Sequence, residues 1–195
     1  DTHIVQRLKE LPAGVQIELL ELLSPNLEPD AFPLLYGLAV SGPTELTRAV
    51  LRAVNRIPAG GAAAFDRVSY LNHADAQVRA LAAAGLCALA PATYTRTVEQ
   101  WIGANAPEDR LAGVLAAGGS GNAAFSPALM SILHHAQDPP LIAACMDALH
   151  AVGLHNLNSM VAPFIAHENA QVRQAALAAF HIEDKTDLQT VIQKL

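Results

Sequence analysis

Aromatic residues and strand-forming runs are scarce in this sequence. Phe, Trp and Tyr together make up 5% of the 195 residues, although 52% of the residues are hydrophobic. Runs of Val, Ile, Thr and aromatic residues at a two-residue period, which would predict β-strands, are absent. Alanine, the residue with the highest helix propensity, is frequent instead. The composition therefore argues against a β-architecture and predicts an all-α protein.

Cysteines and long apolar runs are also few. The 2 cysteines are too few for a disulfide framework. The longest stretch without Asp, Glu, Lys or Arg, residues 111–137, is interrupted by Gly118-Gly119-Ser120-Gly121-Asn122 and by Pro127. A membrane helix needs about 20 mostly apolar residues, so we expect no membrane insertion. No basic start is followed by an apolar run, as in a secretory signal, and we expect a cytoplasmic protein. Because the chain begins at Asp1 rather than Met, we expect a fragment or a processed form.

Basic residues are sparse in the second half of the chain. Residues 1–97 contain 9 acidic and 8 basic side chains, whereas residues 98–195 contain 9 acidic and 4 basic ones. Proteins that bind DNA or RNA cluster Lys and Arg in order to displace counterions from the phosphates. The net charge of −6 and its distribution therefore predict that nucleic acid is not a partner.

The sequence does contain an internal repeat. HADAQVRALAAAGL begins at His73, and HENAQVRQAALAAF begins at His167. Between and before them recurs a pattern of one apolar residue followed by small or apolar residues four, seven and eight positions later. We call the first residue of each pattern the anchor, and successive anchors are 31 or 32 residues apart: Val15, Leu46, Val78, Asp109, Leu141 and Val172. Asp109 fits the apolar pattern loosely, but it aligns Arg110 with Arg79 and Arg173. This regularity predicts a repeat array.

Each repeat is expected to contain two helical segments joined by a short turn. The second segment begins near the anchor and has the periodicity of a helix with one apolar face. Asp75, Asp138 and Asn169 all lie three residues before an anchor, where they can accept hydrogen bonds from the first N–H groups of that segment. Thr186 to Gln189 read as a capping box that opens a last helix. The predicted units are about 1–29, 30–59, 60–91, 92–122, 123–154 and 155–184, with a terminal helix over 185–195.

The repeats resemble the HEAT repeat superfamily, particularly short bacterial HEAT-like repeats of the phycobilisome-lyase type. The resemblance rests on DAQVRALAAAGLCAL and NAQVRQAALAAF, which match the family pattern D/N-x-x-V-R-x-x-A-x-x-A-L. The units anchored at Asp109 and Leu141 lack parts of this pattern, and the first two have Gln16 and Thr47 in place of the arginine. The resemblance covers nearly the whole chain. It implies one right-handed α-solenoid of about six helix pairs, a fold that usually serves as a protein-binding scaffold.

Three arginines follow an anchor directly: Arg79, Arg110 and Arg173. We expect them to form a structural ladder with the turn residues Asp75, Asp138 and Asn169, in their own repeat or in the adjacent one. The alternative is a row of anion-binding groups. The ladder is favoured because the Asp and Asn residues recur with the same period as the arginines.

No catalytic, cofactor or metal site is predicted. The 8 histidines form neither an H-E-x-x-H motif nor a site with paired C-x-x-C, although His135 and His167 lie in successive repeats and leave an adventitious metal site open. Cys145 falls on a core position and Cys87 on the neighbouring face, as expected of small buried hydrophobes. The Gly118–Asn122 segment lacks the G-K-[ST] of a phosphate loop, and we expect a flexible linker there.

Apolar residues also recur at positions expected to face the concave surface of the solenoid. In the third and fourth repeats these are Ala80, Ala83, Ala84, Leu111, Val114 and Leu115. An exposed apolar stripe usually marks an interaction surface, so these residues are the candidate partner-binding site. The alternative is a register error of two residues in the fourth repeat, which would place Leu111 and Leu115 in the core.

The function that this pattern favours is a non-enzymatic scaffold that binds a protein or peptide partner on its concave face. One alternative is a lyase or chaperone-like factor for a chromophore-bearing protein, as in phycobilisome-lyase-type proteins, which would need a tetrapyrrole pocket. Another is a DNA-repair enzyme on a HEAT-like scaffold, which would need a basic concave face. The acidic second half argues against that last alternative.

Overall fold

All regular secondary structure in the described part of the chain is helical. The computed structural model describes residues 7–23, 27, 29–57, 65–154, 157–182 and 185–194, and within these ranges it contains α-helices and 3-10 helices but no strand. The prediction of an all-α protein is therefore confirmed. The chain divides into two compact units, Asp1–Tyr94 and Thr95–Leu195.

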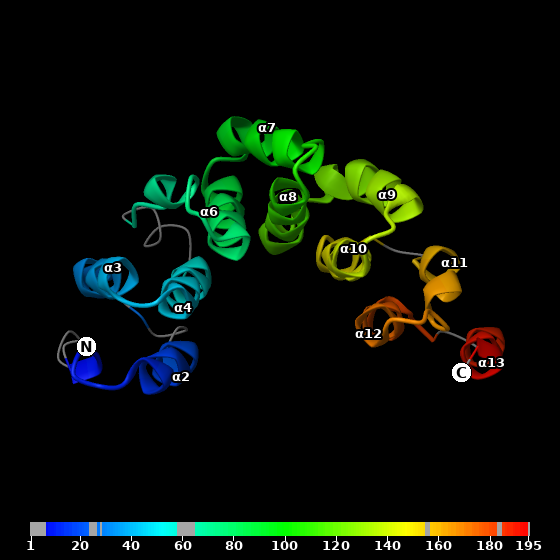
Figure 1. The fold of residues 1–195 in the computed structure, drawn as a ribbon, viewed down its shortest axis with the longest axis horizontal. Coiled ribbons are helices and arrows are strands. Elements are labelled where there is room, and N and C mark those ends of the chain that lie inside the picture. The colour runs from blue at the N-terminus through cyan, green and yellow to red at the C-terminus, as the bar shows by residue number, and fades with distance from the viewer. Residues whose placement is uncertain are drawn as a thin grey trace. The chain divides into compact units, whose positions relative to one another are not determined.

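In the first unit, one helix lies among three others. Helix α4 (Thr44–Asn55) packs against α2 (Ala13–Leu23), α3 (Phe32–Ser41) and α6 (Ala76–Leu89), as Figure 1 shows. Two 3-10 helices complete the unit: η2 (Pro29–Ala31) precedes α3, and η3 (Val68–Tyr70) packs against α6. Helices α2, α4 and α6 thus form one layer, and α3 and η3 pack against one face of this layer.

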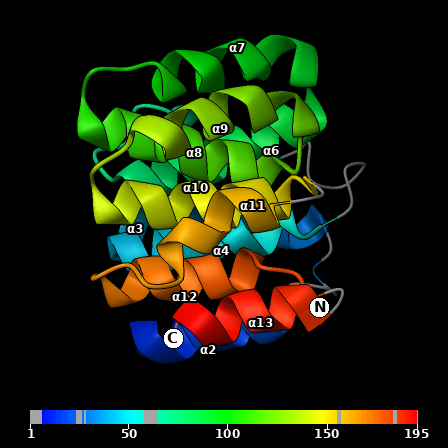
Figure 2. The same cartoon turned by 90° about the vertical axis from the view of Figure 1, so that its right-hand side faces the viewer.

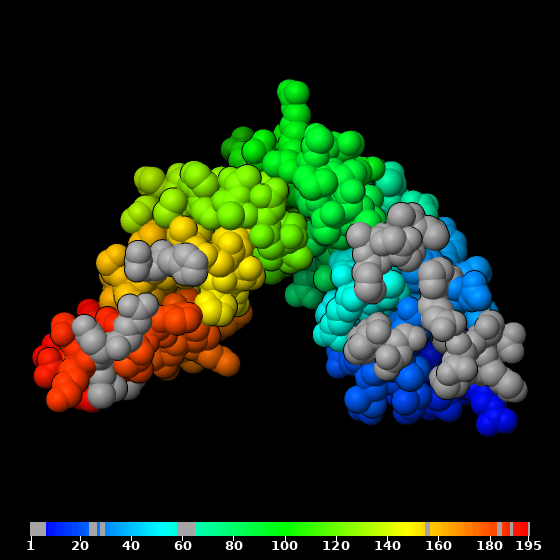
Figure 3. Space-filling model, turned by 180° about the vertical axis from the view of Figure 1, so that it is seen from behind, coloured from blue at the N-terminus to red at the C-terminus, as the bar shows by residue number. Residues whose placement is uncertain are grey.

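The second unit repeats this arrangement. Helix α10 (Pro139–Ala151) packs between α8 (Pro107–Ser120) and α12 (Ala170–Ala179). Helix α9 (Ser126–His135) covers α10, and both α11 (Asn158–Val161) and η5 (Ala162–Phe164) cover α12. Figure 2 looks onto α9, α11 and α13 (Lys185–Lys194), and in Figure 3 the surface of α9, α10 and α12 is continuous. The 3-10 helix η4 (Ala123–Phe125) precedes α9. Helix α7 (Pro91–Ile102) contains the boundary between the two units, which falls between Tyr94 and Thr95.

The second segment of every predicted repeat coincides with a helix, and three of these helices have the predicted N-cap. Asp75 Oδ1 accepts a hydrogen bond from the Val78 N–H at 2.9 Å, and Asp138 Oδ2 accepts one from the Leu141 N–H at 3.3 Å. Asn169 Oδ1 accepts from the N–H groups of the second and third residues after it, at 2.9 and 3.3 Å. These bonds satisfy donors that have no partner within the helix, which explains why Asp or Asn recurs at this position.

The first segments are less regular than expected. In the third repeat the described part of this segment is the three-residue η3, whose first N–H groups are capped by the Asp66 carboxylate. In the sixth repeat, α11 is a single turn that continues as the 3-10 helix η5, with Pro163 in its first turn. Proline has no N–H to donate and fixes its own φ, so it ends the α-helical bonding at this point.

The glycine-rich segment is not the linker that the sequence suggested. Helix α8 continues through Gly118, Gly119 and Ser120, and the chain leaves it at Gly121, which has a φ of +64°. The helix persists because Gly118 lies against α10: a Cβ on Gly118 would be 2.8 Å from the Cα of Ala148. The first of these glycines is therefore a site of close helix packing, and Gly121 is the helix terminus.

The core of the first unit is aliphatic, with an aromatic cluster at one side. The buried aliphatic residues include Leu20, Leu35, Val50, Val54 and Val78. The aromatic cluster combines Phe32, Tyr36, Phe65 and Tyr70, with ring centroids 6.1–6.4 Å apart. Burial, together with neighbouring Tyr36 and Asp66, raises the pKa of the Tyr70 hydroxyl to about 12. These contacts concentrate much of the scarce aromatic content in one unit.

In the first repeat, α2 does not bury the residues that its apolar pattern predicts. Val15 and Leu22, expected in the core, are 41% and 73% exposed, whereas Gln16 and Leu20 are buried. The Gln16 amide is accommodated there because its Nε2 donates to the Leu8 carbonyl at 2.7 Å. A polar residue thus takes the core position of α2, which a search for apolar anchors cannot find.

A buried arginine joins helices α4 and α6 in the first unit. The Arg67 side chain is 1% exposed, and its Nε donates to Asn55 Oδ1 at 3.0 Å. Asn55 in turn donates from Nδ2 to the Leu81 carbonyl at 2.8 Å. The space for this network exists because residue 85 is glycine: a Cβ there would be 2.2 Å from Asn55 Oδ1 and 2.5 Å from Arg67 Nε. Burial lowers the pKa of the Arg67 guanidinium.

The core of the second unit consists of small and aliphatic residues from all its main helices. Its fully buried members include Val98, Ala116, Leu129, Leu149 and Val172. Among the helices that the structure describes, none combines the length and the apolar character needed to cross a membrane.

Candidate functional site

The stripe predicted as a partner-binding surface is mostly buried. Ala80, Ala83 and Ala84 are 1–3% exposed, and Val114 is fully buried. Leu111 and Leu115 are partly buried. The expectation of an exposed apolar stripe is therefore wrong for α6 and for Val114. The physical reason is that α6 is apolar around most of its circumference, and such a helix is enclosed rather than buried on one face.

In five of the six predicted repeats, the side chain of the residue after the anchor donates a hydrogen bond to a backbone carbonyl at the end of the preceding segment. Arg79 Nη1 donates to the carbonyls of His73 and Ala74 at 2.9 and 3.0 Å. Arg173 Nη1 makes the equivalent bonds to the carbonyls of His167 and Glu168, both at 2.8 Å. These carbonyls have no partner within their own helical segment, so the guanidinium satisfies them.

Other residue types act in the same way at this position. Thr47 Oγ1 donates to the Ala39 carbonyl at 2.8 Å, and the Gln16 bond to Leu8 is equivalent. In the fifth repeat the position holds Ile142, which has no side-chain donor and is buried. Arg173 donates to backbone carbonyls of its own turn, and Arg110 likewise donates to the Ala104 carbonyl, so neither bonds to Asp138 or Asn169 as the predicted ladder requires.

An ion pair between the second and third repeats uses a different arginine. Arg48 lies two residues after its anchor, and its Nε donates to Oδ1 of Asp75 at 3.0 Å. A second bond joins Arg48 Nη2 to Asp75 Oδ2. The Arg48 guanidinium is the main cause that lowers the pKa of the Asp75 carboxyl. The position equivalent to Arg48 before Asp138 is Leu111, so this pair is not repeated between α8 and α10.

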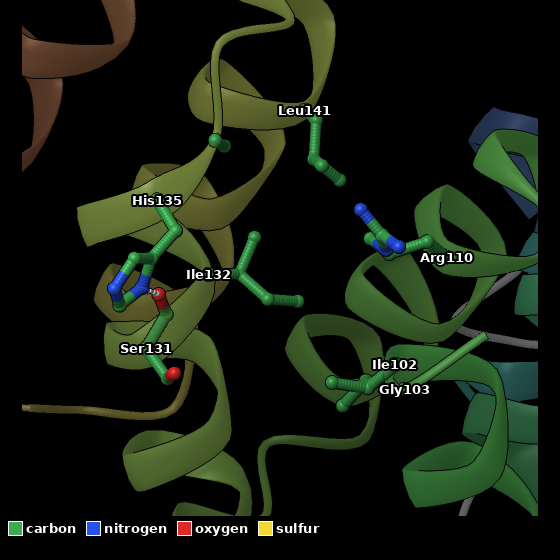
Figure 4. A pocket seen from close by; sticks show the side chains of 8 residues that line it. Ile102, Gly103, Arg110, Ser131, Ile132, His135 and Leu141 are labelled. Atoms are coloured by element: carbon green, nitrogen blue, oxygen red, sulfur yellow. Dashed lines mark hydrogen bonds between the residues drawn. The ribbon is translucent and has the colours of Figure 1, made fainter. Parts of the chain in front are cut away.

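A pocket opens between the turns of the fourth and fifth repeats, within the second unit. Its volume is about 210 Å³. Ile102 and Gly103 at the end of α7 form one wall, and Arg110 projects from α8. The remaining lining comes from the end of α9, the turn after it and the start of α10: Ser131, Ile132, His135, Ala136 and Leu141. Figure 4 shows the Arg110 guanidinium pointing from α8 toward Ile132 and Leu141.

Arg110 is held differently from Arg79 and Arg173. Its Nε and Nη2 both donate to one carbonyl, that of Ala104, at 3.0 and 2.8 Å. The guanidinium therefore presents a different edge to its own turn, and its Nη1 group makes no hydrogen bond within the described residues. At the other wall, His135 Nδ1 lies 2.7 Å from the Ser131 carbonyl. Because a carbonyl only accepts, His135 Nδ1 carries the proton in this contact.

Besides the pocket, the second unit has a group of exposed side chains on and after helices α10 and α12. Asp147 and His150 on α10, and Gln174 and Leu177 on α12, are all exposed. The His150 ring lies 5.8 Å, centroid to centroid, from the ring of His181, which follows α12. Partial desolvation raises the pKa of the Asp147 carboxyl, and the nearby His150 opposes that shift. We call these five residues the α10–α12 face.

The described residues contain no group of three or more His, Cys, Asp or Glu side chains that could hold a metal ion. His73 and His167 stabilise the turns in which they lie, because the Nδ1 of each accepts a hydrogen bond from the N–H two residues later, at 3.0 Å. Cys87 and Cys145 are free and buried. Burial raises the pKa of the Cys87 thiol to about 11 and that of Cys145 to about 12, so neither is activated as a nucleophile.

Sequence reasoning missed both the pocket and the α10–α12 face. The pocket depends on the orientation of Arg110, which spacing alone does not give. The face had a signal: Asp147, Gln174 and Leu177 lie at the same offsets from their anchors as residues of the predicted stripe, and His150 and His181 both lie nine residues after theirs. No protein-family model matches this chain. A search of curated proteins likewise finds no significant similarity.

Proposed function

We propose that this chain is a HEAT-like α-solenoid that binds a protein or peptide partner and is not itself an enzyme. The observation that carries the proposal is a pair of exposed histidines at equivalent positions: His150 and His181 both lie nine residues after their anchors, and their ring centroids are 5.8 Å apart. Repeat proteins bind their partners through rows of such positions, because equivalent positions on stacked helices form one extended surface. The α10–α12 face replaces the buried stripe as the proposed partner surface.

The repeat chemistry supports the HEAT-like assignment. An Asp or Asn caps the second helix in three repeats, and an arginine after the anchor satisfies carbonyls of the turn. In the resemblance on which the assignment rests, these are the D/N and R of the motif. The functional part of the proposal goes further than the fold, because a fold alone does not specify a function.

The composition of the α10–α12 face indicates the kind of partner. Leu177 is 40% exposed and supplies an apolar contact, while Asp147 and the two histidines supply polar ones. A mixed surface of this kind suits a protein or peptide. The second half of the chain is acidic, which is unfavourable for nucleic acid. The free cysteines are typical of a reducing compartment, and we place the protein in the cytoplasm as part of the same proposal.

The experiment that tests this function is partner capture from the native source, followed by reconstitution with the purified partner. Leu177→Glu should abolish binding by placing a charge on the α10–α12 face, with the helical circular dichroism unchanged. Ile192→Glu on α13 is the matched control: Ile192 is 63% exposed and lies outside the face. Equal loss of binding in both variants, or retention in both, would contradict the proposed surface.

The chromophore-lyase alternative makes a different prediction. It requires a tetrapyrrole site, whereas the pocket beside Arg110 holds about 210 Å³ and typical sites for ligands of drug size hold about 300–1,000 Å³. That pocket gives the alternative no support. A titration with biliverdin followed by visible absorption separates the two functions, because a bound bilin changes its spectrum and a scaffold leaves it unchanged.

A further inference from the structure

The pocket beside Arg110 has chemistry that the α10–α12 face does not use. We propose that it binds one acidic side chain, Asp or Glu, of the partner peptide. The inference rests on the proposed function in that the carboxylate belongs to a partner, and it adds the chemistry that the partner presents. Three features of the pocket support it: a fixed cation with unused donors, an apolar wall, and a size that matches one side chain.

The cation is fixed before any ligand arrives. Two N–H groups of Arg110 are bound to the Ala104 carbonyl, which holds the guanidinium plane in place. A guanidinium has five N–H donors and keeps its charge at all accessible pH values, so the Nη1 donors are left for a ligand. Among the residues that the structure describes, no carboxylate forms an ion pair with Arg110. A ligand therefore has no internal carboxylate to displace.

The orientation of Arg110 is the feature that its repeat equivalents lack. Arg79 and Arg173 turn Nη1 toward two carbonyls of their own turns, so that edge of each guanidinium is already occupied. Arg110 instead bonds through Nε and Nη2 and directs its guanidinium toward Ile132 and Leu141 (Figure 4). The same residue type at the same repeat position is thus structural in one turn and open to a ligand in another.

The walls and the volume select the ligand. Ile102, Ile132 and Leu141 provide an apolar surface for a short methylene chain, and Ser131 adds a polar residue to the lining. A volume of about 210 Å³ is smaller than a typical small-molecule site. A carboxylate on one or two methylenes fits the cation, the apolar wall and the volume. It pairs with the guanidinium, its methylenes lie against the isoleucines, and it is small enough for the pocket.

The long-range field does not favour this ligand, because the net charge of the chain is −6. The proposal depends on the direct contact, which is much less screened by salt than the field when the pair is partly buried. It therefore predicts selectivity for a carboxylate over the matching amide, rather than fast association with any acidic peptide. This distinction sets the experiment.

The test uses two blocked tripeptides, acetyl-Ala-Glu-Leu-amide and acetyl-Ala-Gln-Leu-amide, and no natural partner. Binding is followed by NMR of the Arg110 Nε–H and of the Ile132 and Leu141 methyl groups. The Glu peptide should bind saturably and at least about tenfold more tightly than the Gln peptide, in line with a charge-assisted hydrogen bond. Equal affinity of the two peptides, or no saturable shift with the Glu peptide, would overturn the proposal.

Variants assign the effect to the pocket. Arg110→Gln should remove the preference for Glu, while Arg173→Gln, the equivalent residue in the sixth repeat, should leave it unchanged. Because Arg110 also holds the Ala104 carbonyl, Ile132→Glu is a second variant: its carboxylate would occupy Arg110 from within the chain and prevent peptide binding. Loss of the preference in Arg173→Gln would refute the assignment to this pocket. Since no partner is involved, failure here leaves the Leu177→Glu test of the proposed function intact.

Discussion

Arg48 and Asp75 join two successive repeats through both oxygens of one carboxylate. The Arg48 guanidinium on α4 donates to Oδ1 and to Oδ2 of Asp75, while Oδ1 also accepts the Val78 N–H at the start of α6. One carboxylate thus caps a helix and fixes the neighbouring helix. Asp138 has the cap alone, because the position equivalent to Arg48 in its neighbouring repeat is Leu111.

The first prediction follows from this difference. Asp75→Ala should cost more unfolding free energy than Asp138→Ala, because both variants lose a cap, about 0.5–2 kcal/mol, and only the first loses an ion pair. The pair is partly exposed, so its additional contribution should be about 1 kcal/mol or less. Urea unfolding of the two variants measures the difference, and an equal cost would mean that the pair contributes nothing.

The same pair predicts a pH dependence. The pKa of Asp75 is lowered in the folded state, so its contribution to stability is present above the unfolded pKa of about 3.9 and is lost as the pH falls through the folded pKa. The stability of the wild-type protein should therefore fall more steeply on acidification than that of Asp75→Asn. Urea titrations at neutral and acidic pH check this, and parallel pH profiles would contradict it.

The third prediction concerns the space around Arg67. Gly85→Ala should destabilise the first unit by about 1–3 kcal/mol, because the new Cβ would overlap Asn55 Oδ1 and Arg67 Nε. Gly14→Ala in α2 is the matched control: a Cβ there has no atom within 4 Å, and alanine favours the helix by up to about 1 kcal/mol. Opposite shifts in the urea midpoint are expected, and a stable Gly85→Ala would show that the network relaxes freely.

A fourth prediction tests the burial of the cysteines. Both thiols have strongly raised pKa values, about 11 for Cys87 and about 12 for Cys145, and both are buried. Because the thiolate is the reactive form, neither should react with a thiol reagent such as DTNB at neutral pH in the folded protein. Both should react once urea unfolds the chain. Rapid labelling of either thiol in the native protein would contradict the core positions assigned to it.

The sequence was informative where one local rule decides the structure. The period of 31 or 32 residues located the second helices, and Asp75, Asp138 and Asn169 were predicted as caps because an Asp or Asn before a helix has a local reason to be there. The helical class followed from alanine and from the absence of strand patterns. The caps depend on residues within one helical turn, and the period and the alanine content can be counted along the sequence without knowledge of how the helices pack.

The predictions failed where packing between helices decides. Gln16 occupies a core position because Leu8 offers it a carbonyl, and Gly118 stays helical because Ala148 lies against it. The orientation of Arg110 and the resulting pocket depend on Ala104, Ile132 and Leu141, which come from three helix ends or turns. An apolar stripe read from periodicity cannot distinguish an exposed surface from a helix enclosed on all sides.

The last prediction tests that distinction on α8. Val114 is fully buried and Leu111 is partly buried, although both belonged to the stripe predicted to be exposed. Val114→Glu should destabilise the second unit by several kcal/mol, because an unpaired carboxylate must be desolvated or must stay protonated. Leu111→Glu should cost less, since its carboxylate can reach water. Thermal unfolding measures both, with Leu177→Glu as an exposed control that leaves the melting temperature unchanged. If Val114→Glu melted like the wild-type protein, its side chain would face solvent, and the original stripe would again be the better candidate for the partner surface.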